Sequence, residues 1–201
     1  SEWSQAGEPL TKSGVKGFGS VVDIDASRLI VGVPESNLAV IFDRGVSKWT
    51  ETASLTKSNE DFGDSVSIDG DTVVVGAPRG DSSDGAAYLY SLTNGSWKLD
   101  NALTAPDGKD NDYFGKAVAI SAGYVAVGSP GNFDYNTLNP GSGVGKGAAY
   151  IFERKRVAFG ASAVDAGADE ITVGSAAGFN AGDEVIFDIT GGTIGGLSNG
   201  N

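Results

Sequence analysis

The sequence predicts an all-β fold made of three repeated four-stranded antiparallel units, followed by a small partial β module. Two observations predict it. The stretch from Asp61 to Tyr90 contains three short strand patterns separated by turn signals. The same pattern occurs once upstream, from Phe18 to Phe42, and once downstream, from Phe114 to Phe152. A short supersecondary unit that recurs along a chain is typical of a repeat architecture.

The central copy shows why these residues form strands. Polar and apolar residues alternate from Asp64 to Ile68, and Asp69-Gly70 is a strong hairpin turn signal because glycine tolerates a positive φ. Thr72 to Val75 is a β-branched run, which is typical of a strand buried on both faces. Pro78 ends this strand because proline cannot donate to a ladder. The third strand is predicted from Ala86 to Leu92.

Two short motifs recur in all three copies with one fixed spacing. A Phe-Gly pair is followed by a Gly-x-Pro triplet, and 13 positions separate the two first-named glycines (19 to 32, 63 to 76 and 115 to 128). Such a constant spacing indicates a hairpin of fixed geometry. The motif residues expected to hold each repeat together are Phe18, Gly19, Phe62, Gly63, Gly76, Pro78, Phe114, Gly115, Gly128 and Pro130.

A tryptophan-containing element precedes each hairpin and is predicted to supply the fourth strand. The three elements run from Trp3 to Leu10, from Trp49 to Leu55 and from Trp97 to Leu103. Four strands over about 40 to 50 residues is the period of a propeller blade.

On these motifs the chain resembles the FG-GAP repeat proteins, the family that also supplies the blades of the integrin α head. The resemblance covers Trp3 to Phe152. It implies a β-propeller of four-stranded blades, usually seven, so three blades would form an incomplete ring.

Integrin-type blades often carry a calcium loop between strands one and two. Here the connection is a tight turn, such as Asp69-Gly70-Asp71, which is too short to surround Ca²⁺ with six to eight oxygens, so those calcium sites do not carry over.

The repeat is predicted to stop after Phe152, giving a first domain of residues 1–156 and a second of residues 157–201. Arg154, Lys155 and Arg156 replace the tryptophan element, and Phe159-Gly160 lacks the spacing of a further hairpin. Residues 157–201 resemble the small β modules found in tandem in giant bacterial surface proteins, and we expect this module to be truncated at Asn201.

Composition excludes most enzyme classes and several kinds of partner. The chain has no His and no Cys, so neither a Ser-His-Asp triad nor a His/Cys zinc site can be built. A net charge of −12 argues against nucleic acid and anionic membrane surfaces. No apolar run has the length of a transmembrane helix. We therefore expect a non-catalytic protein that does not insert into membranes.

The variable connections between strands two and three and between blades are expected to share one end of the sheets, where binding residues usually lie. The alternative is that they are solvated connectors without a ligand. The predicted ligand-binding residues are Arg79, Asp81, Asp84, Asp134 and Tyr135. Arg79-Gly80-Asp81 matches the tripeptide that integrins recognise, a match that chance explains.

Asp107, Asp110 and Asp112 form a candidate Ca²⁺ site, because carboxylates alternate there around Gly108 as in loops that bind hard cations. The alternative is an ordinary acidic turn, since turns favour Asp, Asn and Gly.

The leading hypothesis for function is an extracellular binding or adhesion module of a large bacterial surface or secreted protein. Two alternatives stay open: a structural subunit that polymerises into a filament, sheath or layer, and an accessory region of an exported enzyme. The expected partners are a protein or carbohydrate ligand, or copies of the chain itself. We also expect further chain or neighbouring subunits to cover the open blade faces, because unpaired sheet edges and exposed apolar faces favour association.

Overall fold

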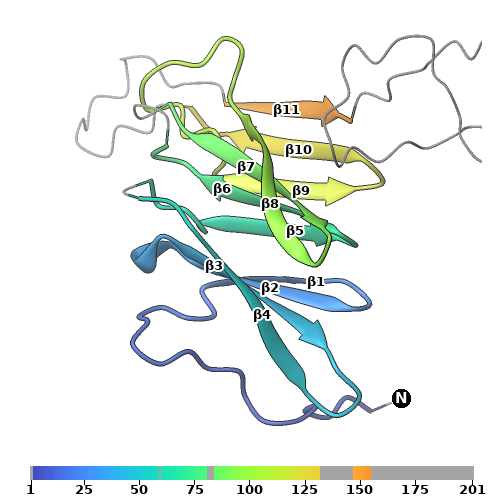
Figure 1. Cartoon of the computed structure of the whole chain (residues 1–201). Coiled ribbons are helices and arrows are strands. Elements are labelled where there is room, and N and C mark those ends of the chain that lie inside the picture. Colours follow the sequence, from blue (N-terminus) through green and yellow to red (C-terminus); the bar gives the residue numbers. More distant parts are fainter. Residues whose placement is uncertain (1, 59, 81–83, 132–146, 155–201) are drawn as a thin grey trace, which may run out of the picture. The chain divides into compact units, whose positions relative to one another are not determined.

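The computed structural model describes residues 2–58, 60–80, 84–131 and 147–154, which belong to one compact unit, Ser1–Arg154. Within these residues there are eleven β-strands and one short 3₁₀ turn, and no α-helix (Figure 1). The strands form three antiparallel sheets, none of which closes on itself. The predicted all-β class with propeller-type blades is therefore confirmed.

Sheet 1 is a four-stranded meander formed by the first hairpin copy and the strand that follows it. Its strands are β1 (Val21–Ile24), β2 (Arg28–Val33), β3 (Leu38–Arg44) and β4 (Trp49–Thr56), in that order across the sheet. The 3₁₀ turn η1 (Pro34–Ser36) connects β2 to β3.

Sheet 2 repeats this arrangement, and sheet 3 has one strand fewer among the described residues. Sheet 2 contains β5 (Ser65–Asp69), β6 (Thr72–Ala77), β7 (Ala86–Thr93) and β8 (Ser96–Leu103). Sheet 3 contains β9 (Ala117–Ser121), β10 (Tyr124–Ser129) and β11 (Ala148–Glu153), with β10 in the middle. In all three sheets the middle strand β2, β6 or β10 ends at the residue before the proline of the Gly-x-Pro triplet, where the ladder would lack a donor.

The tryptophan-containing elements are placed differently from the prediction. β4 pairs with β3 and β8 pairs with β7, so each of these strands is the last strand of the sheet before it and not the first of the next hairpin. The segment from Trp3 to Leu10 forms no strand. Its prediction as a strand was wrong because, within the described residues, no sheet precedes it and offers an edge to pair with.

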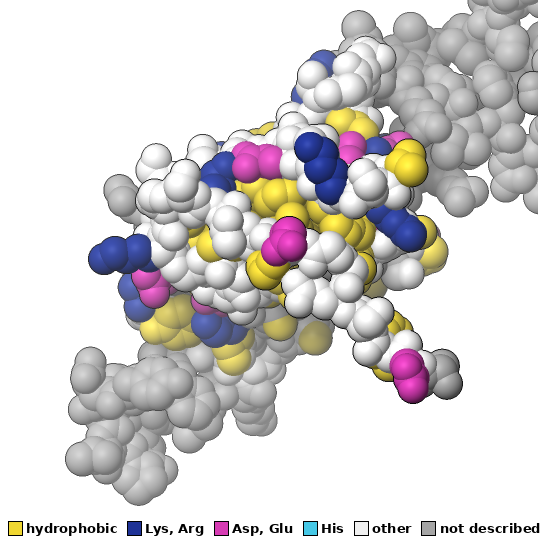
Figure 2. Space-filling view, turned by 90° about the horizontal axis from the view of Figure 1, so that it is seen from below, with side chains coloured by type: hydrophobic (Ala, Val, Ile, Leu, Met, Phe, Trp, Pro, Cys, Tyr) yellow, Lys and Arg dark blue, Asp and Glu magenta, His cyan; other side chains and the backbone are white. Residues whose placement is uncertain are grey.

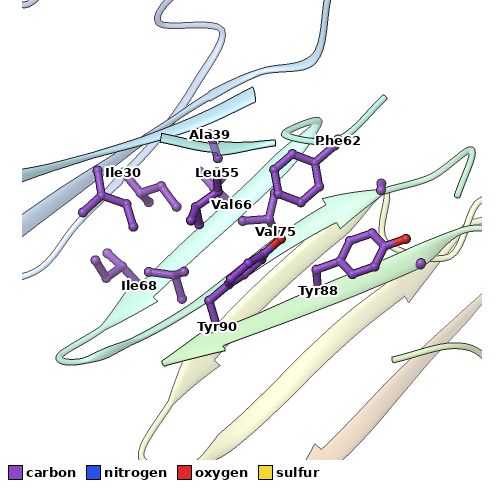
Figure 3. Close-up of a cluster of buried hydrophobic side chains, with 13 residues drawn as sticks. Ile30, Ala39, Leu55, Phe62, Val66, Ile68, Val75, Tyr88 and Tyr90 are labelled. Carbon is purple, nitrogen blue, oxygen red and sulfur yellow. The ribbon is translucent and has the colours of Figure 1, made fainter. Parts of the chain in front are cut away.

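The apolar core lies mainly in two layers between successive sheets. Phe62 is fully buried between sheets 1 and 2, where it belongs to a cluster that includes Ile30 of sheet 1 and Val75 and Tyr90 of sheet 2 (Figure 3). Phe114 occupies the equivalent place between sheets 2 and 3. Phe18 is only half-buried, on the far face of sheet 1.

At the two junctions between sheets, the glycine of a Gly-x-Pro triplet lies against the glycine of the next Phe-Gly pair, and the sheets approach closely there. A Cβ on Gly32 would lie 2.2 Å from the carbonyl oxygen of Gly63, and a Cβ on Gly76 would lie 1.9 Å from that of Gly115. Gly63 and Gly115 themselves have φ values of +95° and +91°, which disfavour any other residue. The fixed spacing of the two motifs therefore places one glycine of each sheet against the glycine of the next.

Polar side chains on the first strands tie neighbouring sheets together. Asp23 Oδ2 accepts hydrogen bonds from the hydroxyl of Ser67 (2.8 Å) and the N–H of Ile68 (2.9 Å), and the Ser67 hydroxyl accepts from the N–H of Ile120 (3.2 Å). In the tight turns, Asp69 Oδ2 accepts from the N–H of Ala122 (2.7 Å). These carboxylates act as braces between sheets.

Candidate binding face

The connections between strands gather at two opposite ends of the sheets (Figure 1). The short turns β1–β2, β5–β6 and β9–β10 lie at one end, which we call the turn end. The connections β2–β3, β6–β7, β4–β5 and β8–β9 lie at the other, which we call the loop end. Hydrogen bonds between the connections of successive sheets show that they are neighbours at each end.

At the loop end, Asn37 joins sheet 1 to the segment that leads into sheet 2. Its side-chain oxygen accepts hydrogen bonds from the N–H groups of Glu60 and Phe62, both at 3.1 Å. Asn37 has a φ of +49°, a left-handed conformation that Asn tolerates better than most residues. The two hydrogen bonds to Asn37 fix the position of the Phe62 backbone relative to sheet 1.

Charged and aromatic side chains surround this junction. Glu60 accepts a hydrogen bond from the Tyr88 hydroxyl, and the Lys57 ammonium lies 4.5 Å from the centre of the Tyr88 ring. Arg79 pairs with Asp61, with Nε 3.2 Å from Oδ2. The junction between sheets 1 and 2 thus presents two cations and two carboxylates beside an aromatic ring, an arrangement suited to a polar or charged ligand.

Burial, reinforced by the nearby Glu60 carboxylate, raises the pKa of Tyr90 from 10.0 to about 12. Tyr90 packs its ring edge against Phe62 within the core between sheets 1 and 2. This tyrosine therefore stays neutral at physiological pH and contributes no charge to the face.

The second junction repeats one of these contacts. Tyr150 stands at the same position of its hairpin as Tyr88, and its hydroxyl donates to Asp107 Oδ1 at 2.7 Å. This hydrogen bond is the main reason that the pKa of Tyr150 is raised. A tyrosine on the third strand is thus tied to a carboxylate in the preceding connection at both junctions.

Asp107, Asp110 and Asp112, the predicted calcium ligands, all lie in the β8–β9 connection. Asp107 is bonded to Tyr150, and Asp112 Oδ2 accepts from the N–H of Lys109 at 2.9 Å. The backbone oxygen of Asp112 accepts from the Ser129 hydroxyl and from the N–H of Gly131. Across the described part of the chain, no three acidic side chains are grouped so that they could hold a metal ion. Calcium at these residues stays a prediction, which titration calorimetry tests.

Of the predicted ligand-binding residues, Arg79 and Asp84 lie at the loop end. The Arg79 side chain is exposed, while the carbonyl oxygen of Asp84 accepts from the N–H of Phe114 at 3.0 Å. Asp84 therefore helps to hold sheets 2 and 3 in register. Asp81, Asp134 and Tyr135 lie outside the described residues.

Sequence reasoning missed Asn37, Lys57, Glu60 and Tyr88 as residues of this face. One signal could have found two of them: a tyrosine occurs at the same hairpin position in the second and third copies, each with a carboxylate upstream in its connection. Asn37 and Lys57 carry no such signal, because their contacts depend on how two sheets stack.

The repeated geometry agrees with a comparison to protein families. A family model of the FG-GAP repeat matches residues 49–90 and 97–152. The chain is an FG-GAP repeat protein. The first hairpin copy lies before the matched residues, and its sheet has the same topology as sheet 2. A comparison with curated proteins finds no match.

Membership of this family supports a broad statement of function. FG-GAP repeat domains are generally non-catalytic binding modules and are typical of extracellular proteins. In the part of the chain that the structure describes, no helix is long and apolar enough to cross a membrane.

Proposed function

We propose that this FG-GAP repeat chain is a binding or adhesion module of a large secreted bacterial protein, and that the loop end of its sheets holds the ligand. The observation that carries the proposal is the group formed by the exposed Arg79 and the half-buried Lys57 and Asp61 at the junction between sheets 1 and 2. Asn37 holds the backbone of this junction by accepting from the N–H of Glu60, and the Tyr88 ring lies beside the Lys57 ammonium. These contacts hold the charged groups in a fixed arrangement. Variable connections on a rigid scaffold are the usual location of binding sites.

The ligand class follows from these groups. Arg79 offers a planar fork of donors that suits carboxylates, and Lys57 offers a point charge. Acidic glycans and acidic peptide segments carry carboxylates in such arrangements. We therefore propose an anionic protein or carbohydrate surface as the ligand, bound through Arg79 and Lys57 despite the net charge of −12 on the whole chain.

A panel of immobilised glycans and extracellular proteins tests this function with the 201-residue chain. We expect binding to acidic members of the panel, and at least a tenfold weaker response for Arg79→Glu. Arg44→Glu is the matched control, since Arg44 is an exposed arginine that bonds Ala26 at the turn end. No binding to any acidic member, or equal losses for both variants, would show that the loop end is not the binding face.

A second candidate function, a self-assembling structural subunit, is favoured by a different observation. Apolar side chains that are buried at the inner junctions are exposed at the equivalent positions on the two outermost sheet faces. Faces of this kind favour association.

A further inference from the structure

The sequence repeat and the sheet are offset by one strand. Each repeat runs from a tryptophan strand to the third strand of a hairpin, as the matched ranges 49–90 and 97–152 show. Its first strand, however, completes the sheet before it. A row of such repeats therefore begins with a strand that has no sheet and ends with a sheet that is one strand short. Among the described residues, the segment Trp3–Leu10 pairs with no sheet, and sheet 3 contains three strands.

We propose that two copies of this chain associate head to tail: the segment Trp3–Leu10 of one copy pairs with β11 of the other as the fourth strand of sheet 3, and that sheet 3 stacks on sheet 1 of the first copy. The inference rests on the second candidate function and is independent of what the loop end binds.

The leucine of the segment already occupies the position that this pairing requires. In sheets 1 and 2 the fourth strand carries Leu55 next to its last residue or Leu103 as its last residue, and each leucine packs into the core formed with the sheet that follows. Leu10 packs in the same way against the apolar face of sheet 1. Leu10 thus packs against sheet 1 within a single copy of the chain, as Leu55 of β4 packs against sheet 2.

The register of the inner junctions predicts a pairing that tolerates the proline of this segment. Leu55 lies opposite Ala39, and Leu103 lies opposite Ala87. The equivalent register places Leu10 opposite Ala149, Pro9 opposite Tyr150 and Glu8 opposite Ile151.

Only alternate residues of β11 offer their backbone groups to a new strand. The N–H of Arg154 donates to the carbonyl of Gly123, so the backbone groups of Phe152 and Tyr150 face β10 in the antiparallel pattern. Those of Ala149 and Ile151 face the other edge, with which no described strand pairs. Pro9, opposite Tyr150, therefore sits where no N–H is needed.

The segment Trp3–Leu10 can also accommodate the bulge that the fourth strands contain. The fourth strand has an irregularity at the same place in both complete sheets, opposite Ile41/Phe42 and opposite Leu89/Tyr90. Gly7 and Ala6 fall at this place in the segment. Glycine is suited to a bulge because it adopts strained backbone conformations without a steric penalty.

The two sheet faces are complementary in their exposed apolar side chains. Val22 and Ile24 of sheet 1 are 59% and 57% exposed, whereas Val66 and Ile68, their equivalents at an inner junction, are each 5% exposed. Figure 2 shows hydrophobic side chains gathered among charged ones on this side of the molecule. On sheet 3, Ile151 is 67% exposed, whereas its equivalent Ile41 is fully buried. Stacking would bury all three side chains.

Hydrogen bonding favours a second copy over a further blade of the usual kind. At the inner junctions the N–H groups of Ile68 and Ile120 donate to Asp23 and Ser67 of the sheet before. Sheet 3 has Ala119 at that position and offers no acceptor. The equivalent N–H of sheet 1, that of Ile24, already donates to Asp23 of its own strand at 2.9 Å. Sheet 3, which offers no acceptor at this position, therefore suits the outer face of sheet 1, where the N–H of Ile24 already has one.

The glycine contact is also available at both ends. Among the described residues, the nearest atom to a Cβ on Gly128 would be the Ala117 Cβ, at 3.3 Å, and a Cβ on Gly19 would meet nothing within 4 Å. The carbonyl of Gly19 can therefore lie against Gly128 as that of Gly63 lies against Gly32. Because the two faces differ, such contacts close into a ring or continue as a filament. Two copies carry twice three sheets, which is within the four to eight blades typical of propellers.

Sedimentation velocity of the 201-residue chain tests the association. We expect dimers or larger species between about 1 and 100 µM, at roughly 0.15 M salt so that the negative charges are screened. Ile151→Asp should shift the chain to monomer, and circular dichroism shows whether it remains folded. Val46→Asp is the matched control, because Val46 is an exposed apolar residue in the β3–β4 turn. A wild-type chain that stays monomeric throughout overturns the proposal and indicates that residues 155–201 or nothing covers sheet 3.

Cross-linking tests the strand pairing itself and benefits from the absence of Cys in the chain. Hydrogen-bonded antiparallel partners have Cα atoms about 5.5 Å apart, which suits a disulfide. A mixture of Glu8→Cys and Ile151→Cys chains should form a covalent dimer on oxidation. Glu8→Cys mixed with Lys98→Cys, an exposed position on β8, should not. Equal cross-linking in both mixtures would overturn the predicted register.

Discussion

Replacing Gly76 by alanine should separate sheets 2 and 3 without disturbing either hairpin. The new Cβ would lie 1.9 Å from the carbonyl oxygen of Gly115 and 2.1 Å from the Ser65 hydroxyl. Neither atom can move freely, because the Ser65 hydroxyl donates to that same carbonyl at 2.7 Å. Gly76 does not need a positive φ, so backbone strain adds nothing and the whole effect comes from the contact.

The expected cost has two parts. Overpacking a close contact costs about 1 to 3 kcal/mol, and loss of the Ser65 hydrogen bond adds about 1 kcal/mol. We therefore expect Gly76→Ala to lower the free energy of unfolding by roughly 2 to 4 kcal/mol, measured by urea denaturation monitored with tryptophan fluorescence.

Gly128→Ala is the matched control, since it is the same substitution at the same position of the next hairpin. Its Cβ would meet nothing closer than Ala117 at 3.3 Å, so in dilute solution it should change the free energy of unfolding by less than about 1 kcal/mol. Equal costs at the two glycines, or no cost at Gly76, would show that the glycine contacts do not control how the sheets stack.

Three further outcomes are expected. Phe62→Ala should cost roughly 3 to 5 kcal/mol in denaturant melts, because the ring is fully buried between two sheets, and the half-buried Phe18→Ala should cost less. Asn37→Ala should cost roughly 1 to 3 kcal/mol, because it leaves the N–H groups of Glu60 and Phe62 without their acceptor; a melt equal to wild type would contradict this role. The raised pKa of Tyr90 stabilises the fold below pH 10, and this contribution is lost as the pH rises towards about 12. Tyr90→Phe should therefore lose less stability than wild type between pH 10 and 12 in thermal melts. An equal fall of melting temperature with pH in the two proteins would contradict this role of Tyr90.

The hairpins were predictable because their signals are local. The Asp69-Gly70 turn, the β-branched run after it and Pro78 all act within a few residues, and the structure places β5 and β6 there. The repeated spacing of Gly63 and Gly76 needed no knowledge of any other sheet. These features depend on local backbone preferences, which are independent of contacts with other sheets.

The partner of each tryptophan strand was not predictable in this way. Trp49 to Leu55 has the alternation of a strand, but that pattern does not say whether β3 or β5 will pair with it. The same holds for the loop end: Asn37 accepts from Glu60 across a stacking of two sheets, which only the assembled structure defines. Contacts between sheets depend on long-range geometry, whereas sequence patterns report neighbours along the chain.

The one-strand offset between repeat and sheet bears on how such a chain can change in length. If one whole repeat were removed, from Trp49 to the residue before Trp97, the strand beginning at Trp97 would follow β3 and complete sheet 1. Phe114 and Gly115 would then take the places of Phe62 and Gly63 against that sheet. Every junction would be made of the same kinds of contact as before, and only their number would differ. Gene duplication or loss in units of one repeat can therefore lengthen or shorten this protein without the invention of a new interface.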